Sequence, residues 1–306
     1  MAEQLLPPPG APYLNADGAI RIVGYNDMQE MLDAITALFR RMHSGFKFEL
    51  ILKGTRTAPD ALARGLSLLA PMGAEFSEAE LAGYARITGG DLPLPFHVAH
   101  DSLNPAALSA PLGVFVDARN PVSTLSMAQL ARVFTGGVMH WGQLGVGGEW
   151  ARRPIHLCGM APATALGRLM LHRLGGEAFA PGFAGYAQSR DAVACVAANP
   201  LAIGFASLNR GVPGVRALPL SAHDGKPAFA GTRDDLVSGR YPLDRHLLIY
   251  LRTDPLTKRI DPVARELLRL MLSAEGQQAI AAGTLGYLPL SEPERMAELK
   301  RLAALE

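Results

Sequence analysis

The sequence predicts an α/β protein built as two lobes, and three observations carry that prediction. Strand-like and helix-like segments alternate from Ile20 onward, which is typical of an α/β fold with mainly parallel sheets. Two short apolar runs, at 96–99 and 246–251, are flanked by proline or polar residues and read as chain crossings between lobes. The length of 306 residues, 49% of them hydrophobic, is sufficient for two lobes with their own cores.

The first elements follow from local pattern. Residues 1–19 are rich in proline and glycine and lack an apolar period, so we expect an extended leader that packs loosely. The run IRIV at 20–23 predicts a strand, and the apolar residues of 28–39 recur at helical spacing. Residues 46–52 alternate as a second strand, and the apolar positions of 61–66 predict a second helix.

The order of these segments predicts an inserted lobe. The first lobe comprises 20–100 together with 245–306, and the second lobe, 101–244, is inserted into it. Ligands of open α/β sheets bind beyond the carboxyl ends of the strands, so we expect a cleft between the lobes. The loops expected to line it lie near positions 24, 54, 73 and 159.

Charge and hydropathy exclude several classes of protein. The 29 basic and 28 acidic residues nearly cancel, so no strong overall field draws the chain to nucleic acid or to an anionic membrane, and we expect no nucleic-acid partner. No apolar run approaches the about 20 residues that cross a bilayer. The start, MAEQLLPPPGAP, lacks the basic and apolar regions of a signal peptide. Composition therefore gives no evidence for export.

Two cysteines are too few for a metal site of their own or for a disulfide scaffold. Cys158 ends a strand-like IHLC, whereas Cys195 lies in a helical stretch. We expect two small buried thiols, with a single bridge between them as the alternative.

The sequence predicts neither an enzyme nor a metal or cofactor site. It contains no Gly-x-Ser-x-Gly elbow, no His-Glu-x-x-His, no Walker loop and no dinucleotide fingerprint. His97 and His100 lie three residues apart on an extended segment, which would turn their imidazoles to opposite faces. We therefore expect hinge or surface histidines at these positions.

Five stretches carry a family resemblance. They are GTRTAP with AL at 54–62, LSMAQLARVFTG with Trp141 at 125–141, VAANPLAIGF at 196–205, YPL at 241–243, and SAEGQ leading to GYLPL at 273–290. In this order and spacing they resemble the periplasmic phosphate-binding protein of the phosphate ABC transporter, over about residues 20–290. The resemblance implies that Trp141 packs in the core and does not stack on a ligand.

The resemblance implies a two-lobed periplasmic binding protein type 2 fold, with a cleft between lobes that are joined by two crossover strands. It implies an extracytoplasmic solute-binding protein, periplasmic or secreted, with phosphate or another small oxyanion as ligand. The implied partner is an ABC transporter permease, and the implied state is a monomer without cofactor. The alternative is an interaction or sensor module of the same fold that has lost phosphate binding.

The resemblance places the first ligand loop at Tyr25, Asn26 and Asp27. The family hydroxyl falls on Asp27, a carboxylate that would repel phosphate if it faced the cleft. We expect Asp27 to cap the following helix, with direct ligand contact as the alternative. Asn26 is a second candidate for both roles.

The second loop is the best retained. Gly54 and Thr55 fall on the family's Gly-Ser pair, and Thr55 keeps the hydroxyl. Arg56 adds a charge that either clamps an anion or points into solvent.

The remaining loops depart from the family. The polar pair of the third loop has become Gly73-Ala74, which leaves only backbone N–H donors. In the fourth loop Met160 replaces an arginine, whose charge-assisted hydrogen bonds are worth about 1.5–3 kcal/mol. Thr164 and Ala165 begin the segment that replaces Ser-Gly-Thr, and Thr164 alone preserves a hydroxyl. The ligand is then either a phosphate-like oxyanion or a larger, partly apolar solute.

Overall fold

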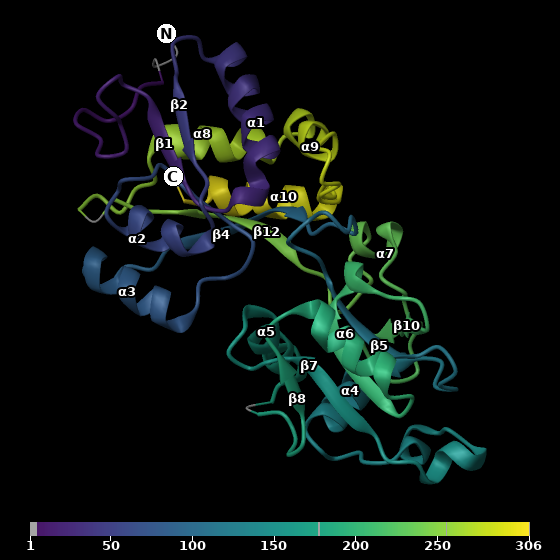
Figure 1. Cartoon of the computed structure of the whole chain (residues 1–306). Helices are drawn as coiled ribbons and strands as arrows, with labels where there is room; N and C mark the ends of the chain where they lie inside the picture. The colour runs from purple at the N-terminus through teal and green to yellow at the C-terminus, as the bar shows by residue number, and fades with distance from the viewer. Residues whose placement is uncertain (1–4, 177, 255, 306) are drawn as a thin grey trace. The chain divides into compact units, whose positions relative to one another are not determined.

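The computed structural model describes residues 5–176, 178–254 and 256–305, which divide into two units (Figure 1). Unit 1 takes its described residues from 1–101, 107–109 and 246–306, and unit 2 from 102–106 and 110–245. The predicted α/β class and the two-lobed organisation are confirmed. No helix in the described ranges is long and apolar enough to cross a membrane.

Unit 1 is built from both ends of the chain. Its strands are β1 (Ile20–Val23), β2 (Phe48–Ile51), β3 (Ala70–Met72), β4 (Leu94–His100) and β12 (His246–Leu251). Its helices are α1 (Gln29–Met42), α2 (Ala58–Ala63), α3 (Glu78–Thr88), α8 (Pro262–Met271), α9 (Ala274–Ala281) and α10 (Glu292–Ala303). Short 3-10 turns, η1 (Asn26–Met28) and η2 (Thr55–Thr57), precede α1 and α2.

The sheets of unit 1 correct the expectation of mainly parallel pairing. β1 and β2 are parallel, but β12 lies between β3 and β4 and is antiparallel to both. The reason is the insertion: β4 carries the chain out of the unit and β12 carries it back, so the two strands run in opposite directions. Helices α1, α8 and α9 pack on one another (Figure 1).

The loose packing expected for residues 1–19 is not found around Tyr13, and residues 1–4 lie outside the described residues. Tyr13 is buried, and its hydroxyl donates to the Asp261 carboxylate at 2.7 Å. The Arg21 N–H donates to the Tyr13 carbonyl at 2.9 Å. The second predicted helix is also shorter than its apolar pattern suggests, because α2 ends at Ala63 and Leu66 is exposed.

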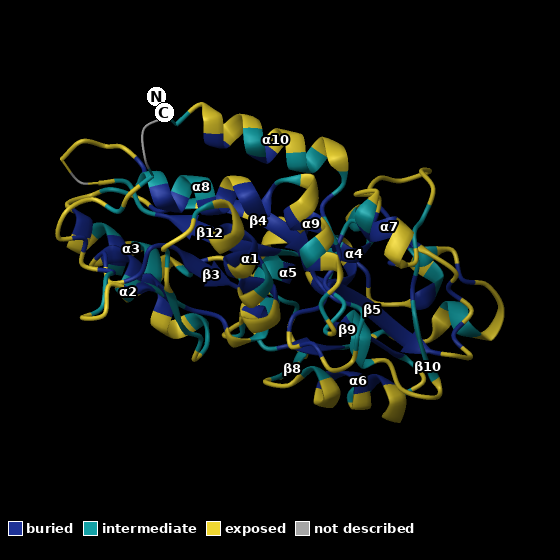
Figure 2. Ribbon diagram, turned by 90° about the horizontal axis from the view of Figure 1, so that it is seen from above, coloured by how far each residue is buried: buried dark blue, intermediate teal, exposed yellow. Residues whose placement is uncertain are grey.

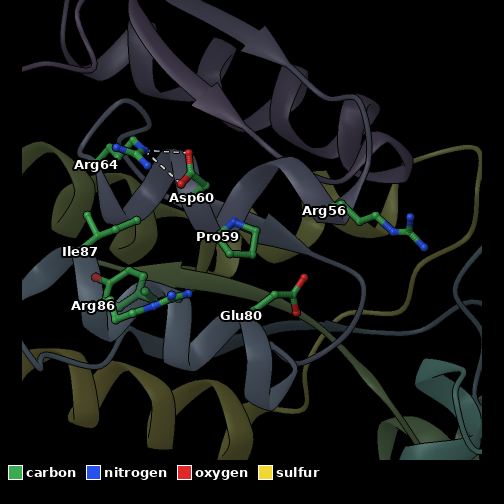
Figure 3. Close-up of a pocket in the computed structure, with 9 residues that line it drawn as sticks. Arg56, Pro59, Asp60, Arg64, Glu80, Arg86 and Ile87 are labelled. Atoms are coloured by element: carbon green, nitrogen blue, oxygen red, sulfur yellow. Dashed lines mark hydrogen bonds and ion pairs between the residues drawn. The ribbon is translucent and has the colours of Figure 1, made fainter.

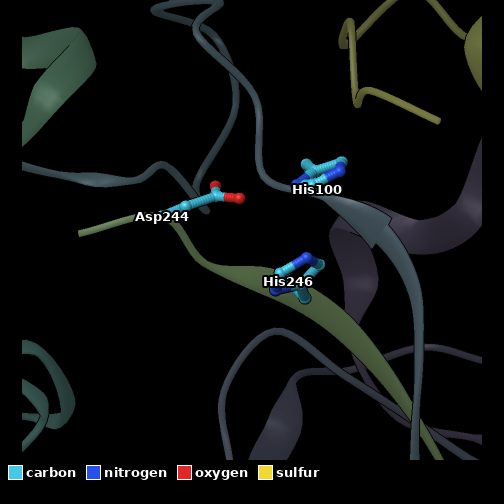
Figure 4. A group of neighbouring side chains, drawn as sticks. All are labelled: His100, Asp244 and His246. Atoms are coloured by element: carbon cyan, nitrogen blue, oxygen red, sulfur yellow. The ribbon is translucent and has the colours of Figure 1, made fainter. Parts of the chain in front are cut away.

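The expectation that His97 and His100 turn their imidazoles to opposite faces is wrong, whereas His97 is exposed, as expected for a surface histidine. His97 and His100 lie on one face of β4, and the ring centroid of each is 4.5 Å from that of His246 on β12. The pairing of β4 with β12 skips Val98, and this bulge reverses the side-chain alternation. Figure 4 shows His100 and His246 on their adjacent strands.

Two glutamates of α10 hold this histidine group. Glu294 lies 3.1 Å from His100 Nε2 and 3.6 Å from His246 Nε2, and Glu298 lies 3.4 Å from His97 Nδ1. Burial raises the pKa of Glu294, but hydrogen bonds from the two histidines and Ser291 outweigh it and hold that pKa well below its usual range. The C-terminal helix is thereby tied to β4 and β12.

Unit 2 has one larger sheet, ordered β10-β5-β9-β7-β8, and a short pair, β11-β6. Its strands are β5 (Leu112–Asp117), β6 (Leu125–Ser126), β7 (His156–Met160), β8 (Ala184–Tyr186), β9 (Ala202–Ser207), β10 (Val215–Ala217) and β11 (Leu220–Ser221). Its α-helices are α4 (Met127–Phe134), α5 (Ala165–Leu174), α6 (Ser189–Ala198) and α7 (Arg233–Val237). The 3-10 turns are η3 (Trp141–Leu144), η4 (Gly148–Arg152) and η5 (Leu208–Arg210).

The core of unit 2 is centred on β5 and β9, which are buried along their whole length (Figure 2). Phe134 of α4 packs edge-on against Phe205 of β9. Trp141 is fully buried and meets Trp150 in a T-shaped contact, which confirms the packing role expected for it.

Cys158 and Cys195 form a disulfide, so the expected pair of free thiols is wrong and the alternative of one bridge is correct. The bridge ties β7 to α6, with a Cα–Cα distance of 6.3 Å. The two elements lie far apart in sequence but pack directly on each other. A disulfide is typical of an oxidising compartment.

We expect the double variant Cys158→Ala/Cys195→Ala to lose about 2–4 kcal/mol of unfolding free energy, because the bridge closes a 37-residue segment in the unfolded chain. Urea unfolding followed by circular dichroism measures the loss. Dithiothreitol should destabilise the wild-type protein and leave the double variant unchanged. Equal stability of oxidised wild type and variant would contradict a structural role for the bridge.

Candidate functional site

Three loops of unit 1 lie together at the carboxyl ends of β1, β2 and β3. The Gly24 N–H donates to the Ile51 carbonyl at 3.2 Å, and the Gly54 N–H donates to the Gly24 carbonyl at 2.9 Å. The Tyr25 N–H donates to the Pro71 carbonyl at 3.0 Å. A Cβ atom on Gly24 would lie 2.4 Å from the Pro71 oxygen, so only glycine fits there. The first three loops predicted for the ligand are therefore neighbours.

Tyr25 fills the space beside the third loop. Its ring is buried, and its hydroxyl is 2.9 Å from Ser109 Oγ. A Cβ atom on Gly73 would lie 2.5 Å from the Tyr25 ring and 2.7 Å from Ser109 Oγ. The serine that the family resemblance implies at position 73 thus has no room. Burial raises the pKa of Tyr25 to about 12, so the phenol stays neutral near pH 7.

Asp27 does not cap a helix, contrary to the expectation from sequence. Neither η1 nor α1 has a side-chain cap. The Asp27 carboxylate accepts a hydrogen bond from the Leu108 N–H at 2.8 Å and a short one from the Tyr287 hydroxyl. Burial, the electrostatic interaction with Tyr25 and the hydrogen bond to Asp27 together raise the pKa of Tyr287. The Asp27 carboxylate therefore makes its hydrogen bonds with residues of unit 1.

Two carboxylates of unit 1 act electrostatically on the Tyr25 phenol. Asp101 is fully buried, and the charges of Asp27 and Asp101 both act on the Tyr25 phenol. Asn26 is exposed, and its side chain makes no hydrogen bond to any described residue. Such surroundings disfavour an anion unless positive groups offset them.

The second loop retains the features of an anion-binding turn. Gly54 has φ +115° and ψ 164°, a backbone conformation that residues other than glycine rarely adopt. Thr55 then begins η2, which continues into α2, so the leading N–H groups of this helical segment lack intrahelical partners. The half-buried Thr55 side chain makes no hydrogen bond within the described chain, whereas the Thr57 hydroxyl donates to the Gly54 carbonyl at 2.9 Å. Thr55 keeps its hydroxyl available.

Arg56 is exposed and lies at one end of a groove of about 480 Å³ between α2 and α3 (Figure 3). Arg64 and Arg86 lie at the other end. Arg64 is paired with Asp60 at 2.9 Å, while no ion pair of Arg56 occurs among the described residues. Arg56 is a free cation next to Thr55.

In unit 2 the fourth loop is capped by its own side chain. The Thr164 hydroxyl donates to the Ala161 carbonyl at 2.7 Å and accepts from the Gly167 N–H at 3.0 Å. This N-cap of α5 uses the hydroxyl that was expected to face a ligand. Ala165 is the first residue of α5, and its N–H lacks an intrahelical partner.

Met160 is buried and does not form an exposed surface of the fourth loop. It ends β7 with 4% of its surface exposed, and its sulfur accepts a hydrogen bond from Ser189 at 3.5 Å. Ser189 Oγ also lies 3.0 Å from Ser207 Oγ. An arginine at position 160 would bury its charge in this region.

The loop before α5 carries a positive group that the sequence analysis did not identify. Arg168, one turn into α5, donates from Nη1 to the Ala163 carbonyl at 2.6 Å. Its guanidinium therefore lies on the loop that lost an arginine at Met160. Sequence reasoning also missed Tyr287 and Ser109. Tyr287 belongs to the GYLPL stretch noted above, whereas no pattern marks Ser109.

Comparison with known proteins agrees with this architecture. The family model of the PBP superfamily domain matches residues 11–275. The phosphate-binding protein PstS of Pseudomonas aeruginosa is 27% identical over 290 residues, which cover 92% of this chain and 85% of that protein.

Solved structures share the fold. An ABC-type phosphate transport receptor from Vibrio cholerae has a TM-score of 0.57 at 19% identity, covering 88% of this chain and 99% of the receptor. PstS from Borrelia burgdorferi has a TM-score of 0.58 at 15% identity, covering 89% and 99%. A putative phosphate ABC transporter substrate-binding protein from Clostridium perfringens, solved with bound phosphate, has a TM-score of 0.53 at 17% identity, covering 89% and 100%.

We expect Gly73→Ala to destabilise unit 1 by about 1–3 kcal/mol, because the added methyl overlaps the Tyr25 ring and Ser109. The same substitution in a Tyr25→Ala background should cost less, since the ring is gone. Urea unfolding of the four proteins of this double-mutant cycle gives the coupling free energy. Additive losses would show that the two positions do not compete for space.

Proposed function

This chain belongs to the PBP superfamily, and we propose that it is an extracytoplasmic solute-binding protein that binds phosphate or a related small oxyanion for an ABC transporter. The likeness to PstS over nine-tenths of the chain supports this function. The disulfide supports an oxidising location, periplasmic or secreted. We further propose that the protein acts by binding alone, without catalysis.

The observation that carries the proposal is the turn at Gly54 and Thr55. The Thr55 hydroxyl, the N–H groups of a helical N-terminus and the Arg56 guanidinium supply several donors and positive charge at one place in unit 1, and neither side chain has a partner among the described residues. In unit 2, the start of α5 and the Arg168 guanidinium offer the same kinds of group. These are the donors that a desolvated oxyanion requires.

A second candidate is a binding module of the same fold that has lost phosphate. It is favoured by Asp27 and Asp101 in unit 1, and by the loss of side-chain donors at Gly73 and Met160. A buried anion that lacks partners is disfavoured by several kcal/mol. Under this alternative the protein takes a larger, partly apolar solute or acts in sensing.

We expect Thr55→Ala to weaken phosphate binding about fivefold, because one net hydrogen bond is worth about 1 kcal/mol. Isothermal titration at pH 7, on protein freed of bound ligand by unfolding and refolding, measures the affinity. Thr57→Ala is the matched control, since its hydroxyl already donates to Gly54, and it should leave the affinity unchanged. Wild-type protein that binds no phosphate but takes up an apolar solute would favour the second candidate.

Arg168→Gln should weaken phosphate binding about tenfold, because it removes the guanidinium from the loop before α5. Arg190→Gln makes the same charge change on α6, at an exposed arginine paired with Asp191, and serves as the control. Titration at two salt concentrations separates local contact from general attraction. Equal losses in both variants would assign the effect to net charge.

A further inference from the structure

Unit 1 contains a second pocket, of about 460 Å³, that uses none of the residues of the three ligand loops. It lies between the N-terminal segment, the turn after α2 and the segment that joins β12 to α8. The lining side chains that matter here are Pro8, Pro9, Pro12, Tyr13, Leu68, Arg252, Arg259, Ile260 and Asp261. The volume is in the range of small-molecule sites.

Arg252 supplies an unused cation to this pocket. Its Nε is buried and has no hydrogen-bond partner, and the guanidinium makes no hydrogen bond or ion pair with any residue that the structure describes. A Cβ atom on Gly65 would lie 3.1 Å from the Arg252 guanidinium and 3.7 Å from Pro12. The absence of a side chain at Gly65 therefore leaves space between Arg252 and the N-terminal segment.

The two carboxylates that line the pocket already accept hydrogen bonds from other residues. Asp261 accepts hydrogen bonds from the Tyr13 hydroxyl at 2.7 Å and from the N–H groups that begin α8. Asp254 accepts three hydrogen bonds from Leu256 and Thr257. The exposed Arg259 has no side-chain partner in the described ranges. Neither arginine side chain therefore has a hydrogen-bond or ion-pair partner among the described residues, although hydrogen bonds from Thr257 and the nearby charge of Arg252 lower the pKa of Asp254.

A buried guanidinium donor without a partner is costly, and a ligand acceptor would relieve that cost. The planar fork of arginine matches a carboxylate in bidentate geometry. The walls formed by three prolines, Leu68 and Ile260 are apolar and leave more space than a bare oxyanion fills. These features select a carboxylate that carries a short apolar body.

We propose that this pocket is a separate binding site for a small organic carboxylate. The carboxylate pairs with Arg252, the apolar body lies against the proline wall of 8–12, and Arg259 stands at the rim. The Tyr13–Asp261 hydrogen bond holds the N-terminal wall in position. The site does not depend on the proposed phosphate function, because it shares no residue with the ligand loops.

The test uses 4-fluorobenzoate and its neutral isostere 4-fluorobenzamide, followed by fluorine NMR on the full chain. Saturable binding of the benzoate, with at least about tenfold weaker binding of the benzamide, is expected. This comparison needs no variant. Equal binding of the two probes, or no saturation of the benzoate up to about 10 mM, would overturn the proposal.

Variants then locate the site. Arg252→Gln should weaken benzoate binding about ten- to hundredfold, Arg252→Lys less, and Arg259→Gln only a few-fold. Thr55→Ala should leave benzoate binding unchanged, and Arg252→Gln should leave phosphate binding unchanged. Unfolding midpoints without ligand confirm that each variant is folded. Unaltered benzoate affinity in folded Arg252→Gln would place the probe elsewhere and overturn the assignment.

Discussion

The short backbone contacts at Gly24 are the constraint on which the rest of the candidate site depends. Through its N–H and carbonyl, Gly24 joins the ends of β1 and β2, and any side chain there would strike the Pro71 carbonyl. The three loops therefore share one rigid base, to which Tyr25 is added as a buried ring. Changes in one loop must be matched in the others, as Tyr25 and Gly73 are.

This coupling explains why the loops after β1 and β3 are well packed although their residues depart from the pattern of the family. Tyr25, Ser109, Asp27 and Tyr287 satisfy one another, so the polar groups nearest β1 and β3 serve the fold. The turn at Thr55 is different, because its hydroxyl stays free. Under the proposed function, anion recognition in this unit would rest on this one turn.

Local pattern predicted the local elements, and long-range packing decided the rest. The IRIV strand and α1 follow directly from period and burial. The bulge at Val98, which brings His97 and His100 to one face, has no signal in the chain. Nor does the pairing of Cys158 with Cys195, since it depends on α6 packing on β7. Asp27 was misread because its partners lie some 80 and 260 residues away.

The discontinuity of unit 1 sets an order of assembly. Unit 2 is nearly continuous in sequence and contains both cysteines, so everything it needs emerges before the last sixty residues of the chain. Unit 1 lacks the central strand β12 of one sheet, along with α8, α9 and α10, until those residues appear. Domains fold as units, and segments that are synthesised early fold first. Unit 2 can therefore fold while unit 1 is incomplete and its strand edges are exposed. Truncations near the C-terminus should therefore prevent unit 1 from folding and leave unit 2 able to fold.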